Sequence, residues 1–374
     1  MTPRCNTLFQ LLRPFNTSYV RRYRRDVEKA HGYQWTSPIK YLTITLPHKK
    51  QKYIGFALEK ISNRTCLSFS KITKIKISPN LYLLHDSPCI SIFGRFNELH
   101  SKHSVSFINI KCDDIGSIHQ ELGLIFGLPL EHTRNDRDSY VTIRQENVIE
   151  SKIVDFQKSE GNDSMDVPYD YGSQMHYGKN SFAKEQTNSI EPADINYLNT
   201  IGHNFGFQFN DYKRLNSYHC HYMCNSHLEK GCERNGYVDR ATCDKCICPP
   251  HFSGTYCDKY KKTKSDCGEN VVFNATTEAQ TFTIKGEKKC YFYINTDENS
   301  KIELTIINMN IGNEEKCLVD EYLEVRYKKD PSVMGALFCK DKNNVLMTSE
   351  GNDISIFYKS SFSGNNVELS FKKV

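Results

Sequence analysis

The sequence has few features of a membrane protein or of a nucleic-acid-binding protein. None of its apolar stretches approaches the roughly 18 residues that a membrane-spanning helix needs, and the longest runs only from Leu122 to Leu130. Its 49 basic and 44 acidic residues give a net charge of +5, and only RRYRR at residues 21–25 forms a basic cluster. We therefore expect no membrane span and no nucleic-acid partner.

The amino terminus also lacks a good signal peptide. Its apolar stretch runs only from Leu8 to Leu12 and is interrupted by Gln10, whereas the apolar region of a signal peptide has about 7–15 residues. Either the true start lies upstream, or export is unconventional, or the protein is no longer exported. We favour an upstream start and interpret residues 1–25 as a leader or the remnant of a pro-segment.

Cysteine, in contrast, is abundant. There are fifteen cysteines, and eleven of them lie between Cys220 and Cys339 inclusive. A dense array without repeated metal-ligand spacing is typical of disulfides formed in an oxidising compartment. Glycosylation sequons begin at Asn16, Asn63, Asn162 and Asn274. Together these features predict a secreted, extracellular glycoprotein.

The hydrophobic pattern changes along the chain. Residues 35–220 mix the apolar spacing of helices with that of strands. Strands are predicted over 41–46 and 105–110 and a helix over 54–61. From residue 267 onward, apolar residues alternate with polar ones at period two, as in 302–306, 354–358 and 367–371. That alternation predicts an antiparallel β-sandwich with one wet face.

One helix is apolar on more than one side. In the stretch HQELGLIFGLPLEHTRNDRDSYV (residues 119–141), Leu122 and Ile125 continue an apolar stripe that starts with Ile115 and Ile118. Leu124 lies on a different face, above Gln120 and Glu121. We therefore expect this helix to be buried on two faces.

Several motifs resemble known families. EHTRNDRDSYV resembles the end of the active-site helix of the astacin metalloproteases, and so do WTSPIKY at Trp35, TCLSF at Thr65, CISIFGR at Cys89, YDYGSQMHYG at Tyr169 and the closing DYKRLNSYHC. The segment ending CICPPHFSGTYC resembles an EGF-like module. CYFYI at Cys290, CLVDEYLEVR at Cys317 and LFC at Cys339 resemble a CUB domain. This order is similar to that of the nematode astacins.

The resemblance implies three domains. They are an α+β astacin-like (metzincin) protease domain at residues 26–220, a small disulfide-rich EGF-like module at 221–258 and an all-β CUB sandwich at 267–374. The implied disulfides are Cys66–Cys220, Cys89–Cys112, Cys224–Cys243, Cys232–Cys246, Cys248–Cys257, Cys267–Cys290 and Cys317–Cys339, which leaves Cys5 unpaired. A basic-residue processing site at Arg25–Asp26 would free an amino group that active astacins bury near the position of Glu131.

The family motif is H-E-x-x-H-x-x-G-x-x-H-E, in which three His bind zinc and the Glu polarises the zinc-bound water. Here Gln120, Leu124 and Leu130 occupy the ligand positions and Glu121 occupies the base position. No shift of register restores the ligands. Relative to His119, Gly123 is four residues on and Pro129 is ten residues on. We expect no zinc and no other cofactor.

Other family residues are predicted to have structural roles. In the Met-turn SQMHYG, we expect Met175 to be a packing residue and Tyr177, a ligand or oxyanion stabiliser in active relatives, to hydrogen-bond to Gln120. Many CUB domains bind calcium through several carboxylates. Asp320 matches one of these, but Ser360–Ser363 stands where another is usual, so we do not expect a calcium site.

The function that follows is binding. The chain is expected to be a catalytically inactive astacin-like protein that contacts extracellular proteins or matrix through its CUB and EGF-like modules and its residual cleft. One alternative is an active secreted metalloendopeptidase with atypical ligation by Glu121, Tyr177 and a nearby His. Another is a decaying duplicate without a selected role.

Overall fold

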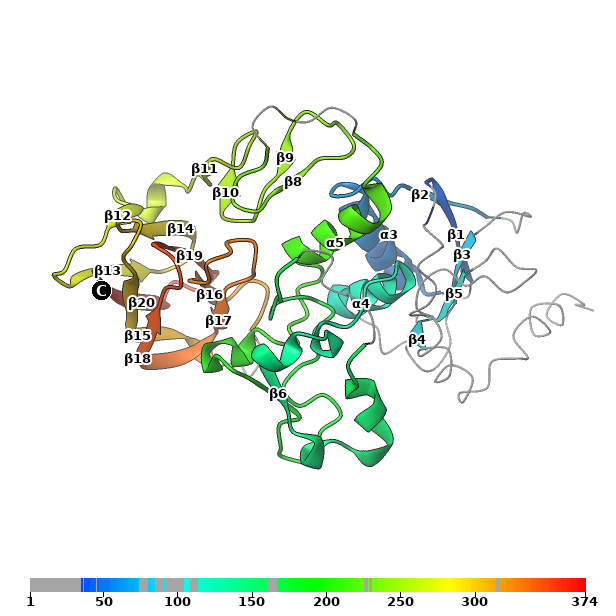
Figure 1. The fold of residues 1–374 in the computed structure, drawn as a ribbon, viewed down its shortest axis with the longest axis horizontal. Coiled ribbons are helices and arrows are strands. Elements are labelled where there is room, and N and C mark those ends of the chain that lie inside the picture. The colour runs from blue at the N-terminus through cyan, green and yellow to red at the C-terminus, as the bar shows by residue number, and fades with distance from the viewer. Residues whose placement is uncertain are drawn as a thin grey trace, which may run out of the picture.

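The computed structural model describes residues 35, 37–44, 46–73, 80–84, 90–91, 104–107, 114–159, 167–224, 228, 231–313 and 317–374. They form an amino-terminal module (to Cys220), a disulfide-rich module (221–258) and a carboxy-terminal β-sandwich (267–374), which lie at the right, top and left of Figure 1. Among these residues, no helix has the length and apolar character needed to cross a membrane.

The amino-terminal module begins with a five-stranded sheet in the order β2-β1-β3-β5-β4, in which only β4 runs antiparallel. Its strands are β1 (Ile39–Ile44), β2 (Phe69–Lys71), β3 (Asn80–Leu84), β4 (Ile90–Ser91) and β5 (Ser104–Phe107). Helix α3 (His48–Ser62) buries Ile54, Ala57, Leu58 and Ile61, the positions that helical spacing places on one face. Strand β1 overlaps the strand predicted over 41–46 and β5 overlaps the one predicted over 105–110, and α3 contains the predicted helix 54–61 but begins six residues earlier, at His48.

The rest of this module is built from two α-helices, short 3₁₀ helices and turns. The α-helices are α4 (Ile115–Ile125) and α5 (Phe209–Cys220). The 3₁₀ helices are η2 (Glu131–Thr133), η3 (Arg137–Ser139), η4 (Gln145–Asn147), η5 (Glu150–Phe156) and η6 (Ile195–Asn199), and β6 (Val141–Ile143) pairs with β7 (Ile190–Pro192).

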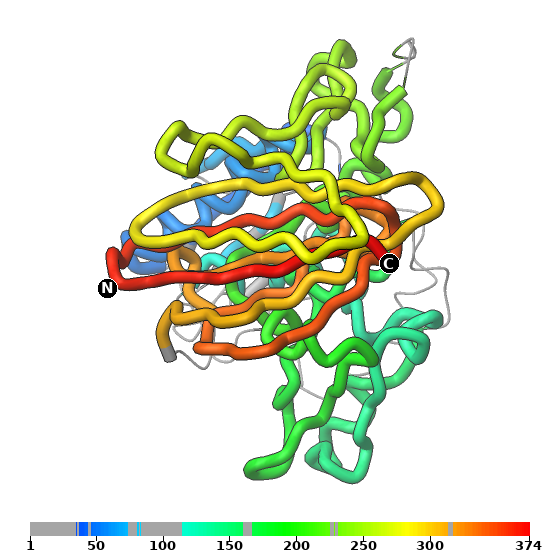
Figure 2. The backbone as a smooth tube through the Cα atoms, turned by 90° about the vertical axis from the view of Figure 1, so that its left-hand side faces the viewer, coloured from blue at the N-terminus to red at the C-terminus, as the bar shows by residue number. Residues whose placement is uncertain are grey.

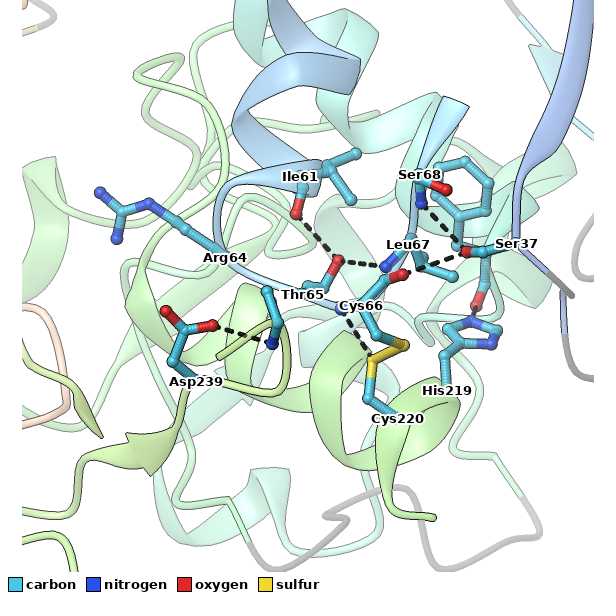
Figure 3. The surroundings of a disulfide bond; sticks show 12 residues. Ser37, Ile61, Arg64, Thr65, Cys66, Leu67, Ser68, His219, Cys220 and Asp239 are labelled. Carbon is cyan, nitrogen blue, oxygen red and sulfur yellow. Dashed lines mark hydrogen bonds between the residues drawn. A yellow bond between two sulfur atoms is a disulfide. The ribbon is translucent and has the colours of Figure 1, made fainter. Parts of the chain in front are cut away.

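A disulfide ties the two ends of this module together. Cys66, just after α3, is bonded to Cys220, the last residue of α5, across 154 residues of sequence. Figure 3 shows the surrounding hydrogen bonds, in which Ser37 Oγ donates to the Cys66 carbonyl at 3.1 Å and accepts from Ser68 N at 3.0 Å. The bridge therefore fixes α5 to the strand and helix that open the module.

The disulfide-rich module consists of two short hairpins and their bridges. The hairpins are β8 (Tyr237–Val238) with β9 (Cys246–Ile247), and β10 (Phe252–Ser253) with β11 (Lys259–Tyr260). The bonds Cys224–Cys243, Cys232–Cys246 and Cys248–Cys257 are those that the EGF-like resemblance implies. A segment with so small a core depends on such bridges for its order.

Two packed sheets form the sandwich. A short 3₁₀ helix, η7 (Ser265–Cys267), precedes its strands β12 (Val272–Asn274), β13 (Gln280–Lys285), β14 (Lys288–Asn295), β15 (Ile302–Asn313), β16 (Tyr322–Arg326), β17 (Ala336–Phe338), β18 (Lys340–Thr348), β19 (Asp353–Ser360) and β20 (Asn366–Lys373). One sheet has the order β12-β14-β19-β16-β17 and the other β13-β20-β15-β18. The disulfides Cys267–Cys290 and Cys317–Cys339 are formed.

The sandwich core matches the period-two pattern. Ile302, Leu304 and Ile306 in β15 are fully buried, and so are the alternating apolar residues of β19 and β20. The sheets are antiparallel as expected, except that β12 pairs with β14 in parallel. Period-two alternation carries no information about strand direction at an edge, so that pairing could not be read from the pattern.

The side chains of the sequons at Asn63 and Asn274 are both exposed, at the end of α3 and at the end of the edge strand β12. Cys5, the expected bridge Cys89–Cys112, the sequons at Asn16 and Asn162 and the processing site Arg25–Asp26 lie outside the described residues.

Candidate functional site

Helix α4 carries the remnant of the protease motif. The Asp114 side chain caps its start by accepting from Ser117 N at 2.8 Å. At its end, Leu128 N donates to Gly123 O and Gly127 N donates to Leu124 O, and Gly127 has φ +84°. This is a Schellman ending, which needs a residue in the left-handed region, and glycine adopts it without a Cβ penalty. Leu130 lies beyond this ending and directly precedes η2.

The three ligand positions of the motif hold one amide and two hydrocarbons. Gln120 Nε2 donates to the Gln174 carbonyl, with 3.4 Å between the two atoms. Leu124 and Leu130 are each 8 % exposed and belong to the apolar cluster that includes Met175. Two of the three positions have no donor atom, so these residues do not fit zinc, which needs three or four N, O or S ligands.

Met175 packs directly beneath the helix. A Cβ on Gly123 would lie 2.5 Å from Met175 Sδ, so any side chain at this position would displace the Met175 thioether. Met175 is fully buried, and its carbonyl accepts from Glu131 N at 3.0 Å. The predicted packing role of Met175 agrees with this position. Glu121, at the base position, is buried at 8 % exposure.

The neighbouring histidines are engaged elsewhere. His119 is fully buried and stacks on Phe207 at 4.6 Å, and burial lowers the pKa of its imidazole to about 3. His132 stacks on Tyr177 with ring centroids 4.0 Å apart, and its Nδ1 accepts from Tyr177 N at 3.4 Å. The Gln120 amide donates to the Gln174 carbonyl, and the expected bond between Gln120 and Tyr177 stays a prediction.

The described part of the chain holds one other group of potential metal ligands. Within the described ranges, only Asp266, Cys267 and Cys290 bring His, Cys, Asp or Glu donor atoms within 4.8 Å of one another, and both cysteines are bonded to each other. A cysteine in a disulfide has no thiolate to offer a metal. That group therefore provides no metal site.

A buried ion-pair network lies beside the former ligand positions. Both nitrogens of the Arg214 fork donate to the Glu131 carboxylate, Arg134 Nη1 approaches the same carboxylate at 3.2 Å, and Asp170 N donates to it at 2.9 Å. Burial acts to raise the pKa of Glu131, but the two guanidinium groups outweigh it and hold that pKa below its usual value.

Two further carboxylates fasten the Met-turn. Asp170 accepts from Gly172 N and Asn210 Nδ2, and Asp211 in α5 accepts from Ser173 Oγ and Gln174 N. Burial raises the pKa of Asp170 to about 7 and that of Asp211 to about 6. This network was not predicted from the sequence, although Arg134, Asp211 and Arg214 lie in the charged segments HTRNDRD and FNDYKR.

A buried histidine that bonds to the carboxy-terminal end of α4 makes the stability of the protein depend on pH. His219 in α5 donates from Nε2 to the Phe126 carbonyl at 2.8 Å, and burial lowers the pKa of its imidazole to about 4. Because the folded pKa lies below the unfolded value, the contribution of His219 to stability is lost as pH falls from about 6.5 to about 4. The loss is about 1.4 kcal/mol per pH unit.

A His219→Gln variant keeps a donor for Phe126 but does not titrate. Its free energy of unfolding relative to wild type is therefore expected to improve steadily between pH 6.5 and pH 4. Urea unfolding at four or five pH values measures this difference. Parallel pH curves for the two proteins would contradict it.

Asp320, the one candidate calcium carboxylate, is paired with a lysine, and its neighbour Glu321 is also engaged. Asp320 forms an ion pair with Lys359 Nζ at 2.5 Å, and the oxygens of Glu321 accept from Ser361 and Asn365. A lysine ammonium beside the candidate carboxylate opposes cation binding. These residues do not fit calcium, which takes several charged or carbonyl oxygens.

Comparisons with known proteins agree with this architecture. Residues 27–220 match the family model of the astacin peptidases, and residues 267–372 match that of the CUB domain. The chain is 28 % identical over 346 residues to the zinc metalloproteinase nas-34 of Caenorhabditis elegans. The aligned region covers 91 % of this chain and 56 % of nas-34. It is 34 % identical over 233 residues to dpy-31 of the same organism, covering 61 % of this chain and 39 % of dpy-31.

A protein of solved structure is similar in sequence as well. The hatching enzyme zinc-protease HCE-1 of medaka, Oryzias latipes, is 30 % identical, with a TM-score of 0.46 over 51 % of this chain and 96 % of that one. The chain spans roughly 40 to 60 % of the length of the curated relatives that it matches. Since one family model covers more than half of the 374 residues, the chain belongs to the astacin family and carries a CUB domain at its carboxy-terminal end.

Proposed function

We propose that this protein is a secreted, catalytically inactive member of the astacin family that acts by binding extracellular proteins. The observation that carries the proposal is the presence of Gln120, Leu124 and Leu130 at all three zinc-ligand positions of the family motif, with both leucines buried in the apolar cluster that contains Met175 of the Met-turn. Each buried leucine contributes about 1.5–3 kcal/mol, which offsets stability that a bound metal would supply.

The rest of the catalytic machinery depends on the metal. Glu121 could polarise a water only if a metal held that water nearby, and its neighbours at the ligand positions offer no such metal. A peptide, by contrast, can add as a strand to the edge of the amino-terminal sheet, where β4 is the last strand. Such binding relies on backbone groups and not on zinc.

Partner binding through the CUB domain is the second part of the proposal. One sheet of the sandwich, β13-β20-β15-β18, faces away from the amino-terminal module and toward the viewer in Figure 2. Its outward residues are accessible to another protein. The disulfides of the disulfide-rich module and of the sandwich support export to an oxidising compartment.

The test measures metal content and proteolysis on the full chain. Purified protein is expected to contain much less than one zinc per chain by elemental analysis, and to leave an unstructured substrate such as casein intact with or without a chelator. The matched control is the triple variant Gln120→His, Leu124→His and Leu130→His. It is expected to regain zinc only in part, because the leucines are packed into the core. Stoichiometric zinc with chelator-sensitive cleavage by the unaltered chain would favour the rival, an active endopeptidase with atypical ligation.

A further inference from the structure

A loop of the CUB domain is buried against the amino-terminal module. We call residues 330–335, between β16 and β17, the Met334 loop. Connecting loops usually run over the surface, yet Ser332, Val333 and Met334 are each at most 5 % exposed. In Figure 1 the strands that flank this loop lie on the side of the sandwich that faces the amino-terminal module.

The Met334 loop meets Asp170 and Gly172, which lead directly into the Met-turn. Met334 N donates to Asp170 Oδ1 at 3.1 Å, and a Cβ on Gly172 would lie 2.4 Å from both Cβ and Sδ of Met334. Gly172 does not have a positive φ, so its own backbone conformation would accept alanine. The neighbouring CUB loop is what excludes a side chain at this position.

Further contacts extend the interface on both sides of the loop. Thr200 Oγ1 donates to Gly335 O at 3.3 Å and accepts from Leu337 N at 2.9 Å. Asp194, just before η6, accepts from Tyr327 OH at 2.7 Å and from Lys328 Nζ at 3.0 Å. These pairs place η6 along β17, the edge strand of its sheet.

Apolar packing joins the two modules as well. The rings of Tyr171 and Tyr197 stack at 4.4 Å, and Tyr197 contacts Tyr327 of the CUB domain at 5.8 Å. One continuous cluster of buried residues runs from Val141 in the amino-terminal module to Ile356 in the sandwich. A shared core of this kind is a feature of one folding unit and not of two modules on a flexible tether.

The sandwich holds the loop from behind. Glu324 Oε1 accepts from Gly335 N at 2.9 Å, and Arg326 pairs with the same carboxylate while donating to the Pro331 carbonyl. His251 of the disulfide-rich module approaches Glu324 Oε2 at 3.4 Å and Ser355 Oγ at 2.8 Å. The Met334 loop is therefore held by hydrogen bonds within the sandwich as well as by its contacts with the amino-terminal module.

We propose that the Met334 loop of the CUB domain is a structural part of the Met-turn, so that the docked CUB domain holds the floor of the astacin cleft in place. The connection runs from Met334 through Asp170 to Glu131, which follows the third ligand position. It does not depend on whether the cleft binds a peptide or cleaves one. It also assigns the β17 edge of the sandwich to this internal contact, which leaves the outer sheet for other proteins.

The test changes one module and measures the other in the full chain. Met334→Ala in the CUB domain is expected to raise hydrogen exchange of the amides of residues 171–178, the Met-turn and the two residues before it, on the order of tenfold, because their support loosens. Gly172→Ala is expected to raise exchange of residues 332–337 by a similar factor. Leu346→Ala is the matched control, since Leu346 is 56 % exposed on β18 of the outer sheet, and it is expected to change neither segment.

A milder variant guards against loss of folding. Thr200→Val removes the hydroxyl between Gly335 and Leu337 with little change of shape, whereas Thr200→Ser keeps the hydroxyl. The first is expected to raise exchange in residues 332–337 and the second to preserve the wild-type rate. Changes confined to the module that carries the substitution, in every variant, would overturn the proposal.

Discussion

Replacing Glu131 by glutamine is expected to lower the free energy of unfolding by about 3–5 kcal/mol, although the two side chains have nearly the same shape. The Glu131 carboxylate is fully buried between Arg214, which is 1 % exposed, and Arg134, which is 2 % exposed. Glutamine would leave these two cations in the interior without their shared counter-charge. Removing one partner from a buried pair costs more than the pair contributes, because the remaining charge stays desolvated.

The loss of stability in Glu131→Gln can be measured in the amino-terminal module through the single tryptophan of the chain. Trp35 is 4 % exposed and donates from Nε1 to the Ile125 carbonyl at the end of α4, so its fluorescence reports on unfolding of the amino-terminal module. The urea midpoint of Glu131→Gln is expected to fall with little change in the slope of the transition.

An exposed pair supplies the matched control. Glu191 forms an ion pair with Arg144 at 2.7 Å, and both side chains are at least 40 % exposed. Glu191→Gln is the same chemical change at the surface, where such pairs often contribute nothing measurable. If Glu131→Gln shifted the urea midpoint no more than Glu191→Gln, the network would not stabilise the fold.

Loss of the Cys66–Cys220 bridge is the second large expected effect. The bridge closes a loop of 154 residues, and the chain-entropy relation gives about 5 kcal/mol of stabilisation for a loop of that length. The double variant Cys66→Ala and Cys220→Ala is therefore expected to unfold at a much lower urea concentration, followed by Trp35 fluorescence. The bridge also positions His219 and the end of α5 (Figure 3), so local packing adds to the loss.

A disulfide that closes a shorter loop tests whether the loss of stability depends on loop length. Cys317 and Cys339 are 22 residues apart in the sandwich, and the same relation gives about 3.4 kcal/mol for their loop. Cys317→Ala with Cys339→Ala is expected to be the less costly pair. An equal or larger loss for the shorter loop would show that native packing around the cysteines, and not loop closure, governs the effect.

The period-two pattern was sufficient to predict the sandwich. Alternation specifies which residues of a strand face the core, and Ile302, Leu304 and Ile306 are buried accordingly. The two buried faces of α4 were also predicted, because Leu124 lies off the stripe of Ile118 and Leu122. The ending at Gly127 follows from local chemistry, since glycine alone enters the left-handed region freely.

The long-range contacts were not predictable in the same way. Two of the four hydrogen bonds that Glu131 accepts come from Arg214, which is 83 residues away in the sequence. The close approach of Gly172 to Met334 joins two modules. Neither contact leaves a periodic signal, because each depends on how separate elements pack. The bond from Gln120 to the Gln174 carbonyl and the stack of Tyr177 on His132 are likewise contacts between distant segments that no local pattern predicts.

By itself, the sequence determined the family motif, the absence of imidazoles at its three ligand positions and the disulfide-rich, β-rich character of the carboxy-terminal half. These are properties of residue type and spacing, which local chemistry translates directly into structure. Only the tertiary structure decided that both leucines lie in the buried cluster that contains Met175, that buried arginines balance Glu131, and that the CUB domain contacts Asp170 just before the Met-turn. Those features arise from desolvation and close packing between distant segments, which exist only once the chain has folded.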